Sequence, residues 1–192
     1  MRFLIWVFLS GALLTTYACN TVSERSANRN ANIGISTTSP RFQATARAIK
    51  SQQPEISDEI LSRDEIVIYA TSPEIIDYYQ QREFSREQAE EVMLLSWQEL
   101  RLRQPTASLD QQTFRASAQD WGFLDIKSTP SGASVMVGDK KLNDPTETGS
   151  LLRPGNYRVQ LSKAGYQSVT DTCQISAGER TEFIRELPPK TP

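Results

Sequence analysis

Hydrophobic residues recur with a helical period through the middle of the chain and alternate with polar residues in its last third. The clearest helical stripe repeats an apolar residue every three or four positions, at Ala89, Val92, Met93, Trp97 and Leu100. Ser85, Arg86, Glu87 and Gln88 form a capping-box pattern before the stripe, and Pro105 ends it. These signals predict a helix of about 18 residues.

Weaker helical signals precede this helix. Ser39 and Pro40 suit an N-cap and a first helical position, and the apolar residues after them share one face, at Phe42, Ala46 and Ile49. Pro54 interrupts the pattern, and a second short helical piece follows it with Ile56, Ile60 and Leu61.

The next segment mixes strand and helix signals. The run 66–69 is β-branched and aromatic, which predicts a short buried strand. Ser72 and Pro73 repeat the N-cap and proline signal, so we expect a further helix to start there. Together these signals predict a mainly helical region over residues 40–105. Residues 106–120, rich in Gln, Ser, Thr and Ala, are expected to form a linker or a loose helix.

From Trp121 onward, short alternating runs are separated by turn residues. Tyr157, Val159 and Leu161 alternate with polar residues, for example, and the turn dipeptide Pro154-Gly155 precedes them. About six or seven such runs over residues 121–188 predict a small antiparallel β-sandwich, with residues 189–192 as a tail. The expected fold class is therefore α+β, a mainly helical N-terminal segment followed by the sandwich.

The N-terminus has the pattern of an export signal. Arg2 precedes an apolar run of about 12 residues, too short for a typical transmembrane helix, which needs about 20. Ala18 then fits a cleavage site with Cys19 directly after it, and this arrangement resembles a bacterial lipoprotein signal. The resemblance implies that residues 1–18 are a signal peptide and that Cys19 carries the lipid. Asn20 in place of an aspartate favours the outer membrane.

Residues 19–39 are expected to form a flexible tether, because they are rich in Asn, Ser and Thr and nearly lack large apolar residues. Two alternatives stay open for the N-terminus. Ordinary cleavage after Ala18 would give a secreted or periplasmic protein, and an uncleaved segment would remain as a membrane anchor.

The amino-acid composition excludes most kinds of enzyme active site. The chain of 192 residues has no histidine and two cysteines, which excludes histidine-based nucleophile systems, His-containing zinc sites and metal sites built from four cysteines. The net charge of -2 gives no reason to expect nucleic-acid binding. Adjacent carboxylates occur at 58–59, 64–65 and 90–91, but helix neighbours point about 100° apart, so we expect solvated acidic faces. We therefore expect no catalytic residue, metal or cofactor.

An ordered set of motifs in the last third resembles the PEGA domain family. The set comprises residues 129–133 (Thr-Pro-Ser-Gly-Ala), 135–138, 152–159 and 163–166. Ser131 stands where the family has Glu, and Pro145-Thr146 reverses the family's usual Thr-Pro.

The resemblance implies a prealbumin-like sandwich of an envelope or surface protein, with polysaccharide or protein as its binding partner. The motif residues are expected to be structural: Pro130, Gly132, Ala133, Pro154, Gly155, Tyr157, Gly165 and Tyr166. Cys173 is expected to be a small core residue.

The favoured function is a non-enzymatic lipoprotein of the bacterial envelope, held at the membrane by its lipid, whose PEGA sandwich serves protein binding or scaffolding. A partner protein would contact the helical stripe at Val92, Met93, Trp97 and Leu100, unless that stripe forms a core. A second hypothesis is a glycan- or peptidoglycan-binding module that stacks sugars on Tyr157 and Tyr166, although their positions favour burial. A third is a hydrolase that uses carboxylates alone.

Overall fold

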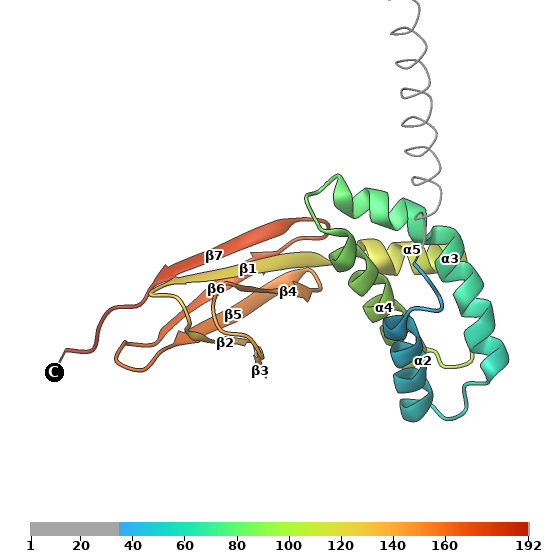
Figure 1. Cartoon of the computed structure of the whole chain (residues 1–192), viewed down its shortest axis with the longest axis horizontal. Coiled ribbons are helices and arrows are strands. Elements are labelled where there is room, and N and C mark those ends of the chain that lie inside the picture. The colour runs from blue at the N-terminus through green and yellow to red at the C-terminus, as the bar shows by residue number, and fades with distance from the viewer. Residues whose placement is uncertain (1–34, 192) are drawn as a thin grey trace, which may run out of the picture.

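The structure, a computed structural model, describes residues 35–191 in two parts that lie end to end (Figure 1). We call residues 35–120, with their four helices, the helical unit, and residues 121–191, with their seven strands, the sandwich. The C-terminus lies at the end of the sandwich that is farthest from the helices (Figure 1). The predicted signal peptide, Cys19 and most of the tether lie outside the described residues. Ile35 is already buried in the helical core, so the tether predicted to reach residue 39 ends earlier.

Helix α2 (Pro40–Gln52) begins where the sequence predicts it. The Ser39 hydroxyl accepts a hydrogen bond from the Phe42 amide over 3.2 Å, which caps the helix. Phe42 and Ile49 are its buried residues. Ser57 caps the next helix, α3 (Asp58–Gln80), in the same way.

The strand predicted at residues 66–69 is wrong, because these residues lie inside α3. The buried side chains of this helix recur with helical spacing, at Ile68, Ile75, Ile76 and Tyr79. Ile66 and Tyr69 fall on the other side and are 69% and 61% exposed. A short β-branched run does not distinguish a strand from a helix, and the longer helical period decides here.

Pro73 also lies inside α3 rather than at the start of a new helix. A proline in a helix lacks one backbone donor. Beside it, the hydroxyls of Thr71 and Ser72 donate to the carbonyl oxygens of Val67 and Ile68 over 2.9 and 2.6 Å. These bonds keep the turn before the proline hydrogen-bonded, so the helix continues.

Helix α4 (Arg86–Arg103) confirms the predicted helix and its capping box. The Ser85 hydroxyl accepts from the Gln88 amide over 3.2 Å, and the Gln88 side chain accepts from the Ser85 amide over 2.9 Å. The predicted linker at 106–120 contains a packed helix instead, α5 (Gln111–Gln119), whose Phe114 and Ala118 are buried. Asp110 caps this helix by accepting from the Thr113 amide.

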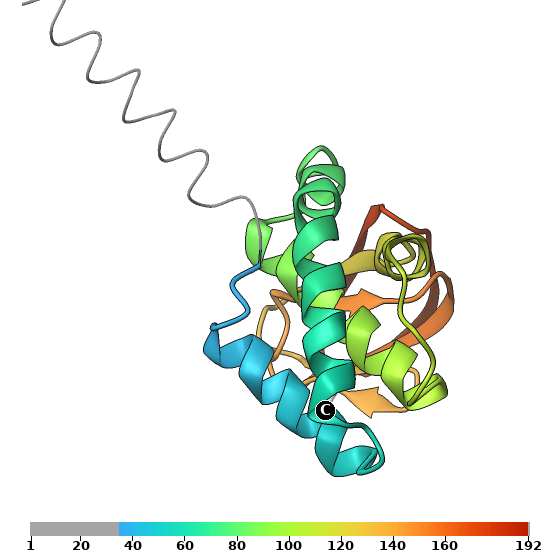
Figure 2. The same ribbon diagram turned by 90° about the vertical axis from the view of Figure 1, so that its right-hand side faces the viewer.

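The four helices enclose one apolar core, and Figure 2 looks onto the helical unit, with α3 crossing in front. Its large side chains come from all four helices and include Phe42, Ile68, Trp97 and Phe114. None of the helices within residues 35–191 is long and apolar enough to cross a membrane.

The seven strands confirm the predicted sandwich and form two sheets. The three-stranded sheet has the order β4 (Thr148–Leu152), β1 (Gly122–Thr129), β7 (Arg180–Glu186). The four-stranded sheet has the order β3 (Lys140–Lys141), β2 (Ser134–Val137), β5 (Gly155–Ser162), β6 (Val169–Ile175). A second apolar core lies between them and includes Leu124, Ile126, Val159, Leu161 and Phe183.

One pairing in the sandwich departs from the expected antiparallel arrangement. Strands β1 and β7 are parallel, with Phe123 opposite Arg180 and Thr129 opposite Glu186. Strand β6 belongs to the opposite sheet, so the chain crosses between the sheets after Ile175 and enters β7 beside the start of β1. The two strands therefore run in the same direction.

The predicted tail is also paired. The amide of Gln167 donates to the Pro188 carbonyl over 2.8 Å, and the amide of Lys190 donates to the Gly165 carbonyl over 2.9 Å. The end of the described chain therefore closes the far end of the sandwich.

Candidate functional site

The helical stripe predicted as a partner face lies inside the protein. Val92, Met93 and Trp97 have no exposed surface, and Leu100 is half-buried. The Phe42 ring stacks on the Trp97 ring with 4.7 Å between centroids, so α2 covers this face. The predicted partner contact is wrong, because the helical unit needs the stripe for its own core.

A buried ion pair that sequence reasoning missed connects α3 to α4. Asp64 and Arg101 are 1% and 2% exposed. The Arg101 Nε donates to the Asp64 Oδ2 over 2.6 Å, its Nη2 donates to Oδ1, and the Trp97 Nε1 donates to Oδ2 over 2.7 Å. The solvated face expected at 64–65 is therefore wrong for Asp64. The available signal was spacing, since Asp64 precedes Ile68 by four residues and Arg101 follows Trp97 by four.

Arg101 also organises the connection from α4 to α5. Its Nη1 donates to the carbonyl oxygens of Gln104, Pro105 and Ala107 over 3.1, 3.1 and 2.7 Å. One guanidinium thus satisfies a buried carboxylate and three backbone carbonyls. The role of this network is structural.

The PEGA-like motif residues lie at turns of the sandwich or against its core. Gly132, in the turn between β1 and β2 that begins with Pro130, has a φ of +79°, which favours glycine. Gly165 has a φ of +81° in the turn between β5 and β6. The Lys163 Nζ donates to the Ser131 carbonyl over 2.7 Å and links the two turns at the far end of the sandwich.

The reversed Pro145-Thr146 pair has a structural role. The Thr146 side chain is buried and accepts a hydrogen bond from the Ala133 amide over 2.9 Å. It also shares a hydrogen bond of 2.6 Å with the Ser128 hydroxyl. Thr146 therefore connects β1, the start of β2 and the loop before β4.

The two tyrosines proposed as sugar platforms are half-buried. Both pack against the sandwich core, and the Tyr157 hydroxyl donates to the Arg153 carbonyl over 2.9 Å, across the turn at Pro154 and Gly155. Their rings do not form an exposed stacking surface. Cys173 is buried, as predicted, and burial raises the pKa of its thiol.

Arg153 joins the sandwich to the helical unit. Its Nε donates to the Glu99 Oε2 over 2.8 Å, and its Nη1 donates to the carbonyl oxygens of Ser117 and Asp120 over 2.8 and 2.9 Å. The guanidinium also lies 4.3 Å from the centroid of the Trp121 ring. One sandwich side chain therefore contacts both α4 and the end of α5.

Arg180 makes a second connection on the other side of the junction. Its Nη1 donates to the Glu83 carbonyl and the Gln88 Oε1 over 3.2 and 3.1 Å, and its Nη2 donates to the Asp125 Oδ2 over 2.7 Å. Its guanidinium is also close to the ring of Phe123, 4.6 Å from the centroid.

The junction also contains a buried tyrosine. The Tyr79 hydroxyl donates to the Ala118 and Trp121 carbonyls over 2.7 and 3.3 Å, and burial raises its pKa well above the usual value. Gly178 is so close to α3 that a Cβ there would lie 2.5 Å from the Tyr78 hydroxyl. These contacts and the two arginines hold the two parts in one orientation.

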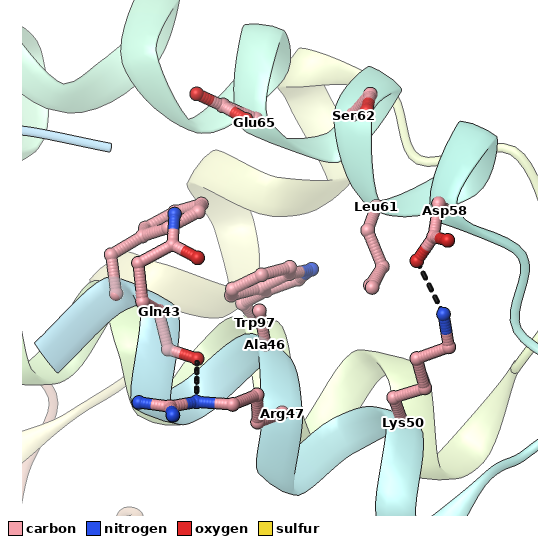
Figure 3. Close-up of a pocket in the computed structure, with 10 residues that line it drawn as sticks. Gln43, Ala46, Arg47, Lys50, Asp58, Leu61, Ser62, Glu65 and Trp97 are labelled. Atoms are coloured by element: carbon pink, nitrogen blue, oxygen red, sulfur yellow. Dashed lines mark hydrogen bonds and ion pairs between the residues drawn. The ribbon is translucent and has the colours of Figure 1, made fainter. Parts of the chain in front are cut away.

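A pocket of about 330 Å³ opens between α2 and α3 (Figure 3). Ala46 and Leu61 provide apolar surface, and a Lys50–Asp58 ion pair lies at one side. The Arg47 Nε donates to the Gln43 backbone carbonyl over 3.2 Å. Since Asp58 is paired and the neighbouring lining residue Glu65 comes from the same helix, the pocket offers no pair of facing free carboxylates.

A groove of about 400 Å³ runs between α4 and strand β4, and we call it the β4 groove. Its apolar surface comes from Leu95, Phe123 and Leu151. Its polar rim includes Glu87, Glu91, Arg41 and Lys140, and Arg41 is paired with Glu91. Hydrogen bonds from its own backbone amide and from the Ser85 hydroxyl hold the pKa of Glu87 below its usual value.

The backbone along this groove is open for pairing. The Phe123 amide donates to the Glu179 carbonyl, and the Thr129 carbonyl accepts from the Leu187 amide. The backbone groups of odd-numbered β1 residues therefore bond to β7, and those of even-numbered residues bond to β4. Their β4 partners are Thr148, Ser150 and Leu152. The N–H and C=O groups of Gly149 and Leu151 therefore point away from β1, and within residues 35–191 no backbone hydrogen bond reaches them.

The other sheet edges in the described chain are protected. Strand β3 is two lysines long, a feature that discourages edge pairing. Strands β6 and β7 close against each other, because Arg185 pairs with Asp171 and the Thr181 hydroxyl donates to the Gln174 carbonyl over 3.4 Å. Strand β4, with a glycine near its centre and no lysine or proline, is the edge left open beside a groove.

Comparison with known proteins identifies the sandwich. Residues 121–191 match the model of the PEGA domain family, and no curated protein matches the chain. This domain type indicates a surface or binding module and is typical of extracellular or periplasmic proteins. The C-terminal part of this chain, residues 121–191, therefore carries a PEGA domain, preceded by helices that the match does not include.

Proposed function

We propose that this protein is a non-enzymatic lipoprotein of the bacterial cell envelope, in which the helical unit is a rigid mount for a PEGA binding module. The observation that carries the binding part is the open backbone of β4 beside an apolar groove. The Arg153 and Arg180 contacts support the role of the helical unit as a rigid base, because they fix the sandwich relative to the part of the chain nearest the anchor.

The anchor rests on the N-terminal sequence. An apolar run of about 12 residues, followed by a cleavage site at Ala18 directly before Cys19, supports cleavage and lipidation. Each buried CH2 group of the attached chains contributes about 0.8 kcal/mol to membrane binding. The described chain begins in the helical unit, and the sandwich extends away from it (Figure 1). A lipid at Cys19 would thus place the helices nearer the membrane and the sandwich farther out.

Cell fractionation tests the anchor. The wild-type protein is expected in the membrane fraction, and Cys19→Ala is expected in the soluble or secreted fraction. Mass spectrometry of the mature N-terminus should show acyl chains on Cys19. A Cys19→Ala protein that still sediments with membranes would contradict the lipoprotein.

The partner proposed for the β4 groove is an extended segment of another protein, added as a strand. Strand addition requires free N–H and C=O groups, which Gly149 and Leu151 present, and a surface for alternate side chains, which Leu95 and Phe123 provide. The three residues Gly149–Leu151 that line the groove span about 10 Å of extended chain. Main-chain hydrogen bonds between β4 and the added strand would supply affinity, and the apolar surface would determine which partner sequences bind.

A pair of variants at one position tests this mode of binding. Leu151→Pro removes the free edge N–H without removing a bond to β1, whereas Leu151→Ala keeps the N–H and shortens the side chain. Peptides selected from a display library on the full mature protein should bind wild type and Leu151→Ala, and should lose binding to a folded Leu151→Pro. Equal binding of those peptides to Leu151→Pro would contradict strand addition, even if the Cys19 result supports the anchor.

A further inference from the structure

The outer face of the four-stranded sheet has a side-chain composition unlike the rest of the surface. The register places Gln160 beside Met136 and Thr170, Arg158 beside Thr172, and Asn156 beside Gln174. This face carries amide and hydroxyl side chains in neighbouring rows, at Asn156, Gln160, Thr170, Thr172 and Gln174. No carboxylate of these four strands points outward, since Asp171 lies on the opposite side and pairs with Arg185.

Arg158 is the exception among the arginines of residues 35–191. Each of the other arginines in this range has an ion-pair or hydrogen-bond partner, as Arg101, Arg153 and Arg180 illustrate. For Arg158, the described part of the chain offers no ion pair or side-chain hydrogen bond. A guanidinium presents a planar fork of donors that matches a carboxylate or a phosphate.

A hollow of about 260 Å³ lies at this arginine, lined by Met136, Gly138, Asp139, Arg158 and Gln160. It exists because Gly138 is opposite Arg158, where its amide donates to the Arg158 carbonyl over 2.8 Å, and it has no side chain to fill the space. Lys141, opposite Met136, adds a second cation to the same face, and Asp139 in the adjoining turn is the one acid among the residues that line the hollow. The face is therefore hollowed, polar and positively charged.

We propose that this face binds an anionic polysaccharide, with Arg158 taking a carboxylate or phosphate group and the amide and hydroxyl rows taking sugar hydroxyls. Amides, hydroxyls and the Asp139 carboxylate together supply both donors and acceptors, which sugar hydroxyls require. A protein interface would be expected to have an apolar and aromatic centre, and this face has Met136 as its single apolar residue. The hollow shares no lining residue with the β4 groove, so this site is independent of the strand-addition proposal.

Titration calorimetry on the full mature protein tests this proposal with four probes of similar length: alginate oligosaccharides, phosphorylated mannan oligosaccharides, neutral dextran and poly-glutamate. At least one of the two anionic glycans should bind, and the stronger one identifies the anion. Arg158→Gln should weaken that binding by about tenfold, since one charge-assisted bidentate contact is lost. Added salt should weaken it as well.

Arg63→Gln is the matched control, because Arg63 is an exposed arginine on the helical unit. It should leave glycan binding unchanged, and Arg158→Gln should keep the thermal stability of wild type because Arg158 has no partner to lose. Dextran binding as strong as that of the anionic glycans, or binding unaffected by Arg158→Gln, would overturn the proposal. Stronger binding of poly-glutamate would overturn it in favour of an acidic protein segment, and failure of both anionic glycans would overturn it outright.

Discussion

The helical unit and the sandwich use polar groups in opposite ways. The helical unit places a carboxylate, a guanidinium and an indole N–H in its interior and satisfies them with one another. The sandwich has a mainly apolar interior, in which Ser128 and Thr146 are the buried polar pair, and it leaves polar groups unpaired at its surface, at the β4 edge and around Arg158. Polar groups that are satisfied internally fix a structure, and polar groups left open are available to a partner.

The largest expected loss of stability comes from a substitution in the interior of the helical unit. Asp64→Ala leaves the Arg101 guanidinium buried without its carboxylate and should lower the free energy of unfolding by about 3–5 kcal/mol. Urea denaturation followed by circular dichroism measures it. The control Asp58→Ala breaks an exposed ion pair of the same helix and should cost less than about 1 kcal/mol. Equal small effects for both variants would contradict the buried network.

A substitution at the junction between the helical unit and the sandwich should cause the next largest loss of stability. Arg153→Ala removes bonds to Glu99, Ser117 and Asp120 and should cost about 2–3 kcal/mol. Because these bonds couple the two parts, the variant should also separate one cooperative unfolding transition into two, which calorimetry can resolve. Arg103→Ala, which breaks a surface contact to the same Glu99, is the control and should keep a single transition.

Tyr79→Phe is a smaller change at the same junction. It removes the hydroxyl that bonds the Ala118 and Trp121 carbonyls and keeps the ring, so stability should fall by about 1–2 kcal/mol. Thermal unfolding of the full chain measures the loss. A neutral result would mean that water replaces the hydroxyl and that the junction is wetter than its geometry indicates.

The smallest expected change in stability comes from a substitution that distinguishes a helix from a strand at residues 66–69. Ile66 is exposed on α3, and alanine has the higher helix propensity, so Ile66→Ala should change stability by no more than about 0.5 kcal/mol. A buried strand residue would lose about 2–5 kcal/mol on the same substitution. Denaturation of this single variant therefore distinguishes the two assignments.

These differences show what the sequence could predict. Helices α2 and α4 were predictable because local caps at Ser39 and Ser85 mark their starts. The strands of the sandwich were predictable because alternation and turn residues are also local signals. Helix α3 was misassigned because its β-branched run satisfies the criteria for a buried strand, and its buried face becomes evident only over the full 23 residues.

The candidate sites were less predictable, because they depend on contacts between distant residues. Arg101 and Asp64 meet across 37 positions. The local signal, their spacing of four residues from Trp97 and Ile68, does not identify them as partners. Strand β4 could be recognised as an open edge only after its single neighbour, β1, was known. Arg158 alternates in sequence like any outward strand residue, and its lack of a partner is a property of the folded sheet.

Hydrogen exchange by NMR at the β4 edge tests whether the sandwich is the binding part of the protein and the helical unit its support. In the free protein, the amides of Gly149 and Leu151 should exchange quickly, and the amide of Ser150, which pairs with β1, should exchange slowly. Saturation with a library-selected peptide should slow Gly149 and Leu151 and leave the exposed side of α3 unchanged. Protection of both amides in the free protein, or fast exchange of both in the saturated complex, would show that β4 is not the binding edge.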